Sequence, residues 1–167
     1  IHFDSLQPLM SSCAFPQLVQ EDITERIKNA TKDDIAYCQF PESFASLLTE
    51  EDCDAIVEKI TSPSLLEFQN MIPLILKLNS TKQYNLLIKL FGNHNNEYLL
   101  KDFEKFSPVV SNFPTESKFH ILTDFLKKLQ SSSIEYFICL QSLYKDFILS
   151  DRLKLIPTLS EHINFSH

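Results

Sequence analysis

The sequence predicts an all-α fold of seven to nine helices, packed as antiparallel hairpins into an α-solenoid-like array or an irregular helical bundle. In most segments apolar residues recur at spacings of three and four, which places them on one face of a helix. Residues typical of helix N-termini precede many of these segments. The apolar/polar alternation of strands is absent from the sequence, as are the Asn-Gly and Asp-Gly pairs of tight hairpin turns.

Helix signals in the first third of the chain lie within residues 16–29, 31–38, 41–48 and 49–60, and the first three are weaker than those of the remaining helices. The last of these has the clearest boundaries. Thr49 can cap its N-terminus, and the acidic residues that follow are favoured in a first turn by the helix dipole. Ile56, Val57 and Ile60 share one face, which we expect to be buried.

The next helix is predicted over residues 62–79, with Ser62 as its cap and Pro63 at its first helical position. A proline fits there because the first amide of a helix has no partner within the helix. Ile72-Pro73 follows inside the same apolar stretch. We expect Pro73 to bend or break this helix, since proline lacks the backbone N–H.

A further helix is predicted over residues 80–92, where Ser80 and Gln83 match the capping-box pattern. The apolar residues that share its predicted inner face are Tyr84, Leu87, Ile88 and Phe91. Gly92 is the only glycine in the chain. Because glycine adopts a positive φ without steric cost, we expect Gly92 to close this helix in the left-handed conformation.

The last third is predicted to hold four helices, within residues 95–106, 115–130, 132–148 and 150–163. The third of these begins with a possible capping box formed by Ser132 and Glu135. The residues expected to face the core are Leu99, Phe103, Phe106, Phe119, Leu122, Phe125, Leu126, Leu129, Phe137, Leu140 or Gln141, Tyr144, Ile148, Leu153, Ile156 and Ile163.

The spacing of these helices is similar to that of a solenoid, because two helices and two turns occupy about 36 residues. Residues 70–91 and 153–163 both place Ile-Pro early in an apolar helix. A proline-bent first helix followed by a straight second one resembles a HEAT repeat. The chain departs from that pattern at Asn79 and at Gln83-Tyr84, where such repeats have Asp and Val-Arg. The resemblance implies a HEAT-like α-solenoid that binds other proteins.

Charge divides the chain into two predicted parts. Residues 1–62 carry a balance of −8 and residues 63–167 a balance of +1, which together give the net charge of −7. We interpret the first part as an acidic helical segment that packs on or precedes the core, and the second as the helical-hairpin region. Because the chain begins at Ile1, we also expect it to be a fragment of a longer protein.

Several chemistries are excluded by the residues that are missing. Phosphate-binding loops, dinucleotide fingerprints and nucleophile elbows need two or more glycines, and this chain has one. The five histidines and four cysteines form no His-x-x-x-His, Cys-x-x-Cys or Glu-x-x-His pair. We therefore expect no cofactor, no metal ion and no catalytic residue. We interpret the cysteines as reduced thiols in an intracellular protein, nuclear or cytoplasmic, and no apolar run is long enough to cross a membrane.

Two charged clusters are candidate binding sites. Glu50, Glu51, Asp52 and Asp54 lie within five residues, and they indicate either a solvated first helical turn or a surface for a basic partner. A calcium loop is excluded because its alternating ligands and glycine are missing. Four lysines could form a basic strip on one face of the last third, or simply a solvated face: Lys118, Lys127, Lys128 and Lys154.

These observations favour a non-enzymatic protein–protein interaction module that forms part of a larger assembly. The alternative is a helical adaptor of an RNA- or DNA-associated complex, which would use the lysines of the final third. An all-α enzyme with a dispersed site is a third alternative. The first two differ in their salt response, because binding through several phosphates weakens steeply as salt rises.

Overall fold

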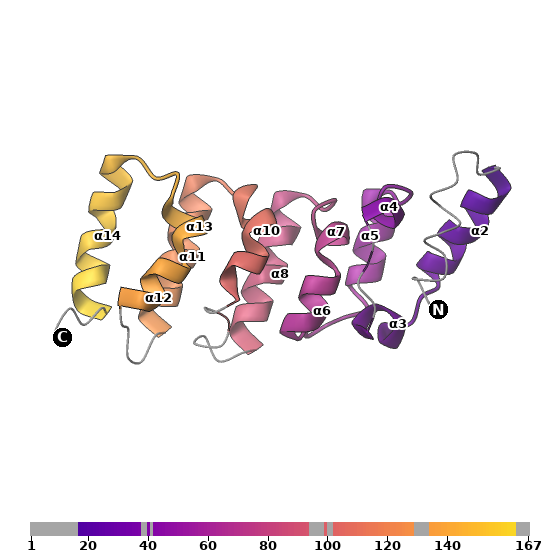
Figure 1. Cartoon of the computed structure of the whole chain (residues 1–167), viewed down its shortest axis with the longest axis horizontal. Coiled ribbons are helices and arrows are strands. Elements are labelled where there is room, and N and C mark those ends of the chain that lie inside the picture. The colour runs from indigo at the N-terminus through magenta and orange to yellow at the C-terminus, as the bar shows by residue number, and fades with distance from the viewer. Residues whose placement is uncertain are drawn as a thin grey trace. The chain divides into compact units, whose positions relative to one another are not determined.

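The computed structural model describes residues 17–37, 40, 42–93, 99, 102–128 and 134–162 (Figure 1). Every regular element within these residues is a helix, and none of them forms a strand, so the predicted all-α class is confirmed. The chain forms two compact units, Ile1–Gln83 and Tyr84–His167. The division between residues 62 and 63 that the charge balance indicates falls inside the first unit. The predicted roles of those two parts stay predictions.

The first unit consists of short helices and ends inside a longer one. Their bounds are α2 Gln17–Lys28, α3 Lys32–Tyr37, α4 Glu42–Ala45, α5 Glu50–Val57, α6 Leu65–Asn70, α7 Ile72–Ile75 and the first residues of α8, Ser80–Asn93. α3 packs on α6, and both α4 and α5 pack on α7. The backbone N–H of Phe40 donates to the carbonyl of Asn70 at 3.0 Å, which ties the loop after α3 to the end of α6.

The start of α5 matches the prediction closely. The Thr49 side chain accepts a hydrogen bond from the Asp52 N–H, and the Asp52 carboxylate accepts one from the Thr49 N–H, both at 3.2 Å. This reciprocal pair is a complete capping box. Ile56, Val57 and Ile60 are buried, with exposed fractions of 3% or less.

The helix predicted over residues 62–79 is two helices with a later start. Its cap is Ser64 and not Ser62, because Glu67 lies three residues after Ser64 and completes a capping box with it. The break falls at Met71, between α6 and α7. Pro73 lies in the first turn of α7, where its missing N–H costs no hydrogen bond. The expected effect of Pro73 is therefore confirmed, and the expected positions of Ser62 and Pro63 are wrong.

The cap of α8 is Asn79, and the capping box expected between Ser80 and Gln83 is not formed. The Asn79 side-chain oxygen accepts from the Lys82 N–H at 3.1 Å. Ser80 is already the first residue of the helix. Gln83 is buried and turns backwards, where its Nε2 donates to the Leu78 carbonyl at 2.6 Å and to the Leu76 carbonyl at 3.4 Å. It thus satisfies carbonyl groups that the end of α7 leaves without a helical partner.

Gly92 does not close α8 in the left-handed conformation. The helix continues through it to Asn93, and the φ of Gly92 is not positive. No atom of another part of the chain lies within 4 Å of the position that a Cβ would take at Gly92. The corner interpretation of this glycine is therefore wrong, and Gly92 is an exposed residue in the last turn of a helix.

In the second unit the structure describes the remainder of α8 and several further helical elements. They are the 3-10 helix η1 Phe103–Phe106, α10 Ser107–Ser111, α11 Thr115–Lys128, α12 Ile134–Cys139, α13 Gln141–Tyr144 and α14 Leu149–His162. α13 packs on both α10 and α11, and α14 packs on α11. α10 was not predicted, although Pro108 in its first turn is a typical start signal.

Phenylalanines fill the core of this unit. The ring of Phe91 lies 4.3 Å from that of Phe125 and 6.0 Å from that of Phe103, centroid to centroid. Phe103 and Phe106 contact edge to face. The prediction that Leu99, Phe103 and Phe106 are buried is confirmed, with exposed fractions of 1% or less. Leu122, Phe125 and Leu126 are buried as well, whereas Phe119 is half-buried and Leu129 lies outside the described residues.

The segment predicted as one helix over residues 132–148 is divided at Leu140 into α12 and α13. The N–H groups of Leu140 and Leu143 bond to carbonyls three residues back, at 3.1 and 2.8 Å, which tightens the chain there. The buried residues are consequently Leu140, Leu143 and Phe147, while Phe137 and Tyr144 are half-buried and Gln141 and Ile148 are exposed. Ser132 lies outside the described residues, and so does the side chain of Glu135.

α14 presents a different face to the core from the one predicted. Leu155 is buried, with 2% of its surface exposed, whereas Leu153 and Ile156 are 53% and 54% exposed. Ile163 lies outside the described residues. The helix also runs unbroken through Pro157, although a break was one of the expected effects of that proline.

Candidate functional site

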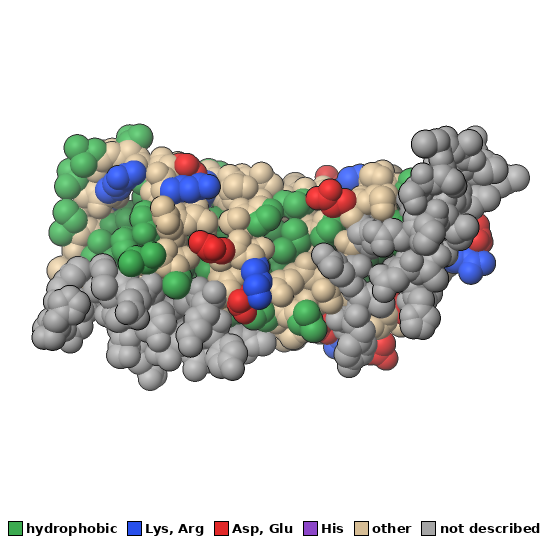
Figure 2. Space-filling model, in the orientation of Figure 1, with side chains coloured by type: hydrophobic (Ala, Val, Ile, Leu, Met, Phe, Trp, Pro, Cys, Tyr) green, Lys and Arg blue, Asp and Glu red, His purple; other side chains and the backbone are tan. Residues whose placement is uncertain are grey.

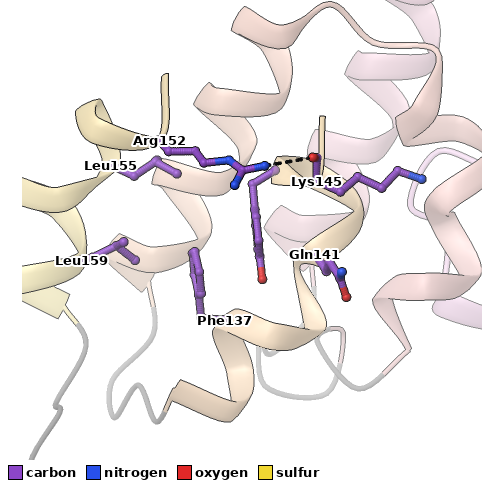
Figure 3. A pocket seen from close by; sticks show the side chains of 7 residues that line it. Phe137, Gln141, Lys145, Arg152, Leu155 and Leu159 are labelled. Carbon is purple, nitrogen blue, oxygen red and sulfur yellow. Dashed lines mark hydrogen bonds between the residues drawn. The ribbon is translucent and has the colours of Figure 1, made fainter. Parts of the chain in front are cut away.

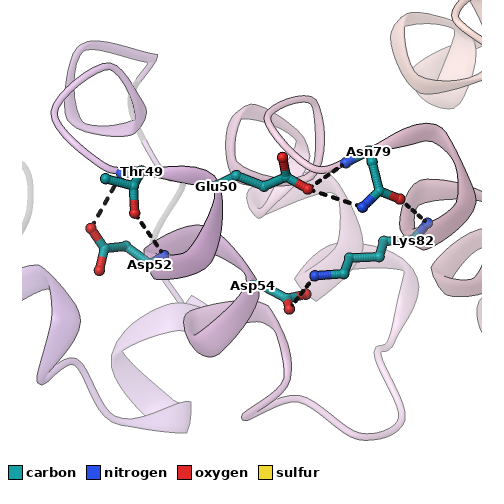
Figure 4. Close-up of polar contacts among 6 residues, drawn as sticks. All are labelled: Thr49, Glu50, Asp52, Asp54, Asn79 and Lys82. Carbon is teal, nitrogen blue, oxygen red and sulfur yellow. Dashed lines mark hydrogen bonds and ion pairs between the residues drawn. The ribbon is translucent and has the colours of Figure 1, made fainter.

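The four acidic residues of α5 are not equally free to meet a partner (Figure 4). Glu50 accepts two hydrogen bonds from Asn79, from its backbone N–H at 3.1 Å and from its side-chain Nδ2 at 3.0 Å. Asp54 forms an ion pair with Lys82. Glu51 is exposed and has no partner among the residues that the structure describes. The first unit therefore supplies its own partners for most of this cluster.

Asp52 completes this picture, because it forms an ion pair with Lys28 at 2.9 Å in addition to capping α5. The hydrogen bond from Lys28 lowers the pKa of the Asp52 carboxyl, and the bonds from Thr49 act in the same direction. Four carboxylates within five residues repel one another, and a basic partner surface would relieve that repulsion. Lys28 and Lys82 already relieve part of that repulsion within the chain.

The lysines of the predicted basic strip differ in burial and in their partners. Lys118 is buried, with 5% of its surface exposed, and its Nζ lies 3.5 Å from the Asp146 carboxylate. Lys154 is exposed and pairs with Asp151 at 3.0 Å. Lys127 is exposed, and the side chain of Lys128 is not described. Lys118 is therefore too buried to belong to an exposed strip. Among the described residues, no two of the four lysines share a contact partner.

The second unit has an open groove of about 380 Å³ between α12, α13 and α14 (Figure 3). Its lining residues are Phe137, Gln141, Tyr144, Lys145, Arg152, Leu155 and Leu159. The rings of Phe137 and Tyr144 stack at 4.4 Å. Burial raises the pKa of Tyr144, so its hydroxyl keeps its proton at neutral pH. No carboxylate, thiol or imidazole is among these lining groups.

Arg152 stands at the edge of the groove and fixes the corner between α13 and α14. Its Nε donates to the Phe147 carbonyl at 2.8 Å, and its Nη2 donates to the Lys145 carbonyl at 3.3 Å. These acceptors are five and seven residues back along the chain. Gln83 bonds to the carbonyls of Leu78 and Leu76, which are also five and seven residues back. Gln83 and Arg152 therefore donate hydrogen bonds to carbonyls at the same two relative positions, although their side chains differ.

A shared spacing extends this correspondence to the buried core. Four sets of four residues share one spacing, in which the second, third and fourth residues follow the first by 4, 9 and 13 positions. All four residues are buried in three of these sets. The four sets are Phe44, Leu48, Cys53, Val57; Leu74, Leu78, Gln83, Leu87; Val109, Phe113, Lys118, Leu122; and Leu143, Phe147, Arg152, Ile156. Only the fourth set departs from burial, at Arg152 and Ile156, both of which lie on α14.

α14 carries the largest exposed apolar surface among the described helices. Ile148 and Leu149 at its start are 67% and 74% exposed, and Leu153 and Ile156 follow on the same side at helical spacing. Figure 2 shows apolar side chains gathered over this helix. Among the other described residues, the large apolar side chains with comparable exposure are Leu66 and Ile138. A cluster of this kind is unusual on a surface that faces only water.

Titratable groups suited to catalysis or metal binding are sparse in the part of the chain that the structure describes. No group of three His, Cys, Asp or Glu side chains converges there. Burial raises the pKa of the Cys53 thiol to about 11, so it is protonated and a poor nucleophile at neutral pH. His120 is exposed on α11. No helix within the described ranges is both long enough and apolar enough to cross a membrane.

Comparison of the chain with family models, curated proteins and solved structures found no match in any of the three. The candidate sites therefore rest on this chain's own geometry.

Sequence reasoning missed the surface of α14 for a specific reason. Leu153 and Ile156 lie at the spacing of a buried helical face, and so do Leu155 and Leu159 on an adjacent face of the same helix. A helix with two apolar faces gives no sign in its periodicity of which face turns inward. The presence of two apolar faces was the available signal for a second contact, because a helix that only covers a core needs a single apolar face.

Proposed function

We propose that this chain is a non-enzymatic protein–protein interaction module, built from repeated pairs of helical segments in the manner of a HEAT-like α-solenoid. The observation that carries the proposal is the uncovered apolar face of α14. Exposed apolar clusters on folded proteins mark the sites at which another protein binds. The lining of the groove supports the same proposal, since it offers aromatic, aliphatic and cationic contacts but no group that could act as a general base at neutral pH.

The repeated arrangement is supported by the spacing that recurs four times and by the matching corner bonds of Gln83 and Arg152. In three places along the chain a pair of short helical segments precedes a longer helix: α6 and α7 before α8, η1 and α10 before α11, and α12 and α13 before α14. Proteins built in this way bind partners along extended surfaces and function within larger assemblies.

The nucleic-acid alternative loses support, because binding to phosphates needs several accessible cations on one surface. Lys118 is buried beside Asp146, and Lys154 is paired with Asp151. Of the four lysines in the predicted strip, Lys127 is the one whose described side chain is exposed and outside an ion pair.

The acidic residues of α5 remain a second proposed contact, for a basic partner surface. The geometry changes how this contact is tested. Substituting Glu50 or Asp54 would also remove the bonds to Asn79 or Lys82, so a slower association could reflect a damaged fold. Glu51→Lys is the clean variant because Glu51 is exposed and has no described partner. We expect a reduced association rate at low salt and an unchanged fold, and an unchanged rate would rule this contact out.

The proposed function is tested by affinity capture with the intact chain, followed by titration of each purified candidate partner. We expect at least one protein to bind saturably, with an affinity that is unaffected by nuclease or EDTA and varies little between about 0.05 and 0.2 M salt. Binding that requires nucleic acid, or that weakens by orders of magnitude over that range, would favour the alternative. Failure of every purified candidate to bind saturably would contradict the proposed function.

A further inference from the structure

The contacts that cover α11 show what would cover α14. Phe147, which follows α13, stacks on Phe119 of α11 with ring centroids 6.3 Å apart. One residue earlier, Asp146 pairs with Lys118 of α11. Leu143 of α13 is fully buried in the same unit, in which α13 packs on α11. One short segment thus supplies α11 with an acidic and an aromatic contact, and the helix of that segment which packs on α11 also carries a buried leucine.

The same kind of contact covers α8. The ring of Phe113, which follows α10, lies 5.9 Å from that of Tyr84 of α8. In the shared spacing, Phe113 corresponds to Phe147 and Tyr84 corresponds to Phe119. Two long helices of the second unit are therefore covered by a ring at the same relative position of a short segment.

α14 has the receiving residues of this interface and no described segment on top of them. By position, Leu153 corresponds to Tyr84 and Phe119, Arg152 to Lys118, and Ile156 to the fully buried Leu122. Leu153, Arg152 and Ile156 are all exposed. Arg152 also keeps the positive charge of Lys118, and its bonds to two carbonyls leave further N–H donors of the guanidinium available.

We propose that the exposed face of α14 binds a short helical segment of a partner protein together with the turn that follows it, and that this segment carries apolar residues at positions i and i+4 and a carboxylate at i+3. The apolar positions are those of Leu143 and Phe147, and the acidic position is that of Asp146. The segment continues the interface that α13 makes with α11. Its i+4 side chain packs on Leu153, its first apolar residue approaches Ile156, and its carboxylate pairs with Arg152.

This inference rests on the proposed function and adds to it the surface and the chemistry of the partner. Carboxylate recognition follows from Arg152, because a guanidinium offers two parallel N–H groups to a carboxylate. The apolar part follows from Leu149, Leu153 and Ile156, which together form a continuous stripe along the helix.

The probe is a synthetic peptide with the sequence of residues 134–148, fluorescently labelled and capped at both ends. The peptide carries Gln141→Glu, and a lactam bridge between this glutamate and Lys145 holds it helical, since both positions are exposed in the structure and short peptides are not helical alone. Fluorescence anisotropy is measured with the intact chain. We expect saturable binding that weakens by about tenfold or more in the double variant Leu153→Ser/Ile156→Ser, which removes two apolar contacts.

The matched control is Ile138→Ser. Ile138 is 58% exposed, close to the values of Leu153 and Ile156, but it lies on α12. Because all three side chains are exposed, the variants are expected to keep the wild-type circular dichroism spectrum. Equal weakening by Ile138→Ser and the α14 variants, or no saturable binding of the bridged peptide at all, would overturn the proposal.

The charge contact is tested with Arg152→Gln, since Gln83 makes the same two carbonyl bonds at the corresponding position. We expect this variant to weaken binding of the peptide and to have no effect on a peptide carrying Asp146→Asn. Equal effects on both peptides would show that Arg152 does not read the carboxylate, and would overturn that part of the proposal.

Two further outcomes separate this inference from the proposed function. If captured partners bind the Leu153→Ser/Ile156→Ser variant as tightly as the wild type, the module function stands and the α14 surface is wrong. If the wild-type chain self-associates in sedimentation velocity and the double variant does not, the occupant is a second copy, and the proposed partner segment is wrong.

Discussion

α11 and α14 are two helices of the same unit with the same length, 14 residues, and opposite surroundings. Leu122 on α11 is fully buried, whereas Ile156 at the corresponding position of α14 is 54% exposed. Lys118 and Arg152, also at corresponding positions, are buried and exposed respectively. The residue types are similar at these two pairs of positions, so the difference in burial comes from what packs on each helix. The same helical face thus forms core in one helix and surface in the other.

The largest expected effect separates the two helices directly. Leu122→Ala should lower the free energy of unfolding by about 2–5 kcal/mol, because it leaves a cavity in the core. Ile156→Ala should change it by no more than about 0.5 kcal/mol, since the side chain is already half in water. Urea denaturation followed by circular dichroism measures both. Similar losses in the two variants would show that α14 is covered as fully as α11.

The next effect concerns how the helices begin. Asn79 caps α8, whereas Ile148, at the corresponding position before α14, has no oxygen in its side chain. Asn79→Ala should cost about 1–2 kcal/mol of stability, because the Lys82 N–H loses its acceptor and Glu50 loses a donor.

The converse variant is Ile148→Asn, which should stabilise the second unit by about 0.5–1 kcal/mol. Ile148 is exposed, and its carbonyl already accepts from the N–H groups of Asp151 and Arg152, as that of a cap residue does. Thermal unfolding of the two variants measures both signs. A loss of stability in Ile148→Asn would mean that this exposed apolar residue has a structural role.

The contribution of Asp52 to the stability of the start of α5 should depend on pH. The pKa of Asp52 is lowered in the folded chain, first by the hydrogen bond from Lys28. Its stabilising contribution is therefore present above the unfolded-state pKa of about 3.9 and is lost as the pH falls through the folded-state value. Because the pair is partly exposed, we expect at most about 1 kcal/mol. Urea unfolding at several pH values should show wild type and Asp52→Asn differing at pH 6 and converging below pH 4, and a constant difference would contradict this assignment.

The last expected effect corrects the sequence interpretation of Gly92. In a helical conformation with open space around the Cβ position, Gly92→Ala should stabilise the chain by about 0.5–1 kcal/mol. A left-handed glycine would give a loss instead. The sign of the change in melting temperature decides between the two conformations.

The sequence was sufficient for features that depend on neighbouring residues. The Thr49 cap follows from the residue type that precedes the helix, and the buried face of α5 and the aromatic residues around Phe103 follow from spacings of three and four. The cap of α8 was missed because a second candidate, Ser80, stood next to Asn79, and the contact that accompanies Asn79 comes from Glu50. Gly92 was misjudged because glycine permits the left-handed conformation without requiring it.

The sequence signal for the candidate site on α14, a helix with two apolar faces, does not show which of the two faces is exposed. Periodicity finds an apolar face but does not identify the element that covers it, and coverage depends on contacts between distant segments. The acidic cluster was located correctly along the chain. The ion pairs and hydrogen bonds that Lys28, Asn79 and Lys82 make with these acids could not be predicted. Each of the three residues lies 24 to 29 positions along the chain from the acid that it contacts.

The bond between Glu50 and Asn79 has a consequence for folding order. A helix start stabilised by a carboxylate 29 residues away cannot reach full stability until α5 has formed and the intervening chain has closed into a loop. Closure of that loop is expected to limit the rate at which the first turn of α8 becomes protected from hydrogen exchange. A shortened chain that begins after α5 would still have Asn79 to cap α8. It would lack the acceptor of the Asn79 N–H, and its α8 would fray from the N-terminal end.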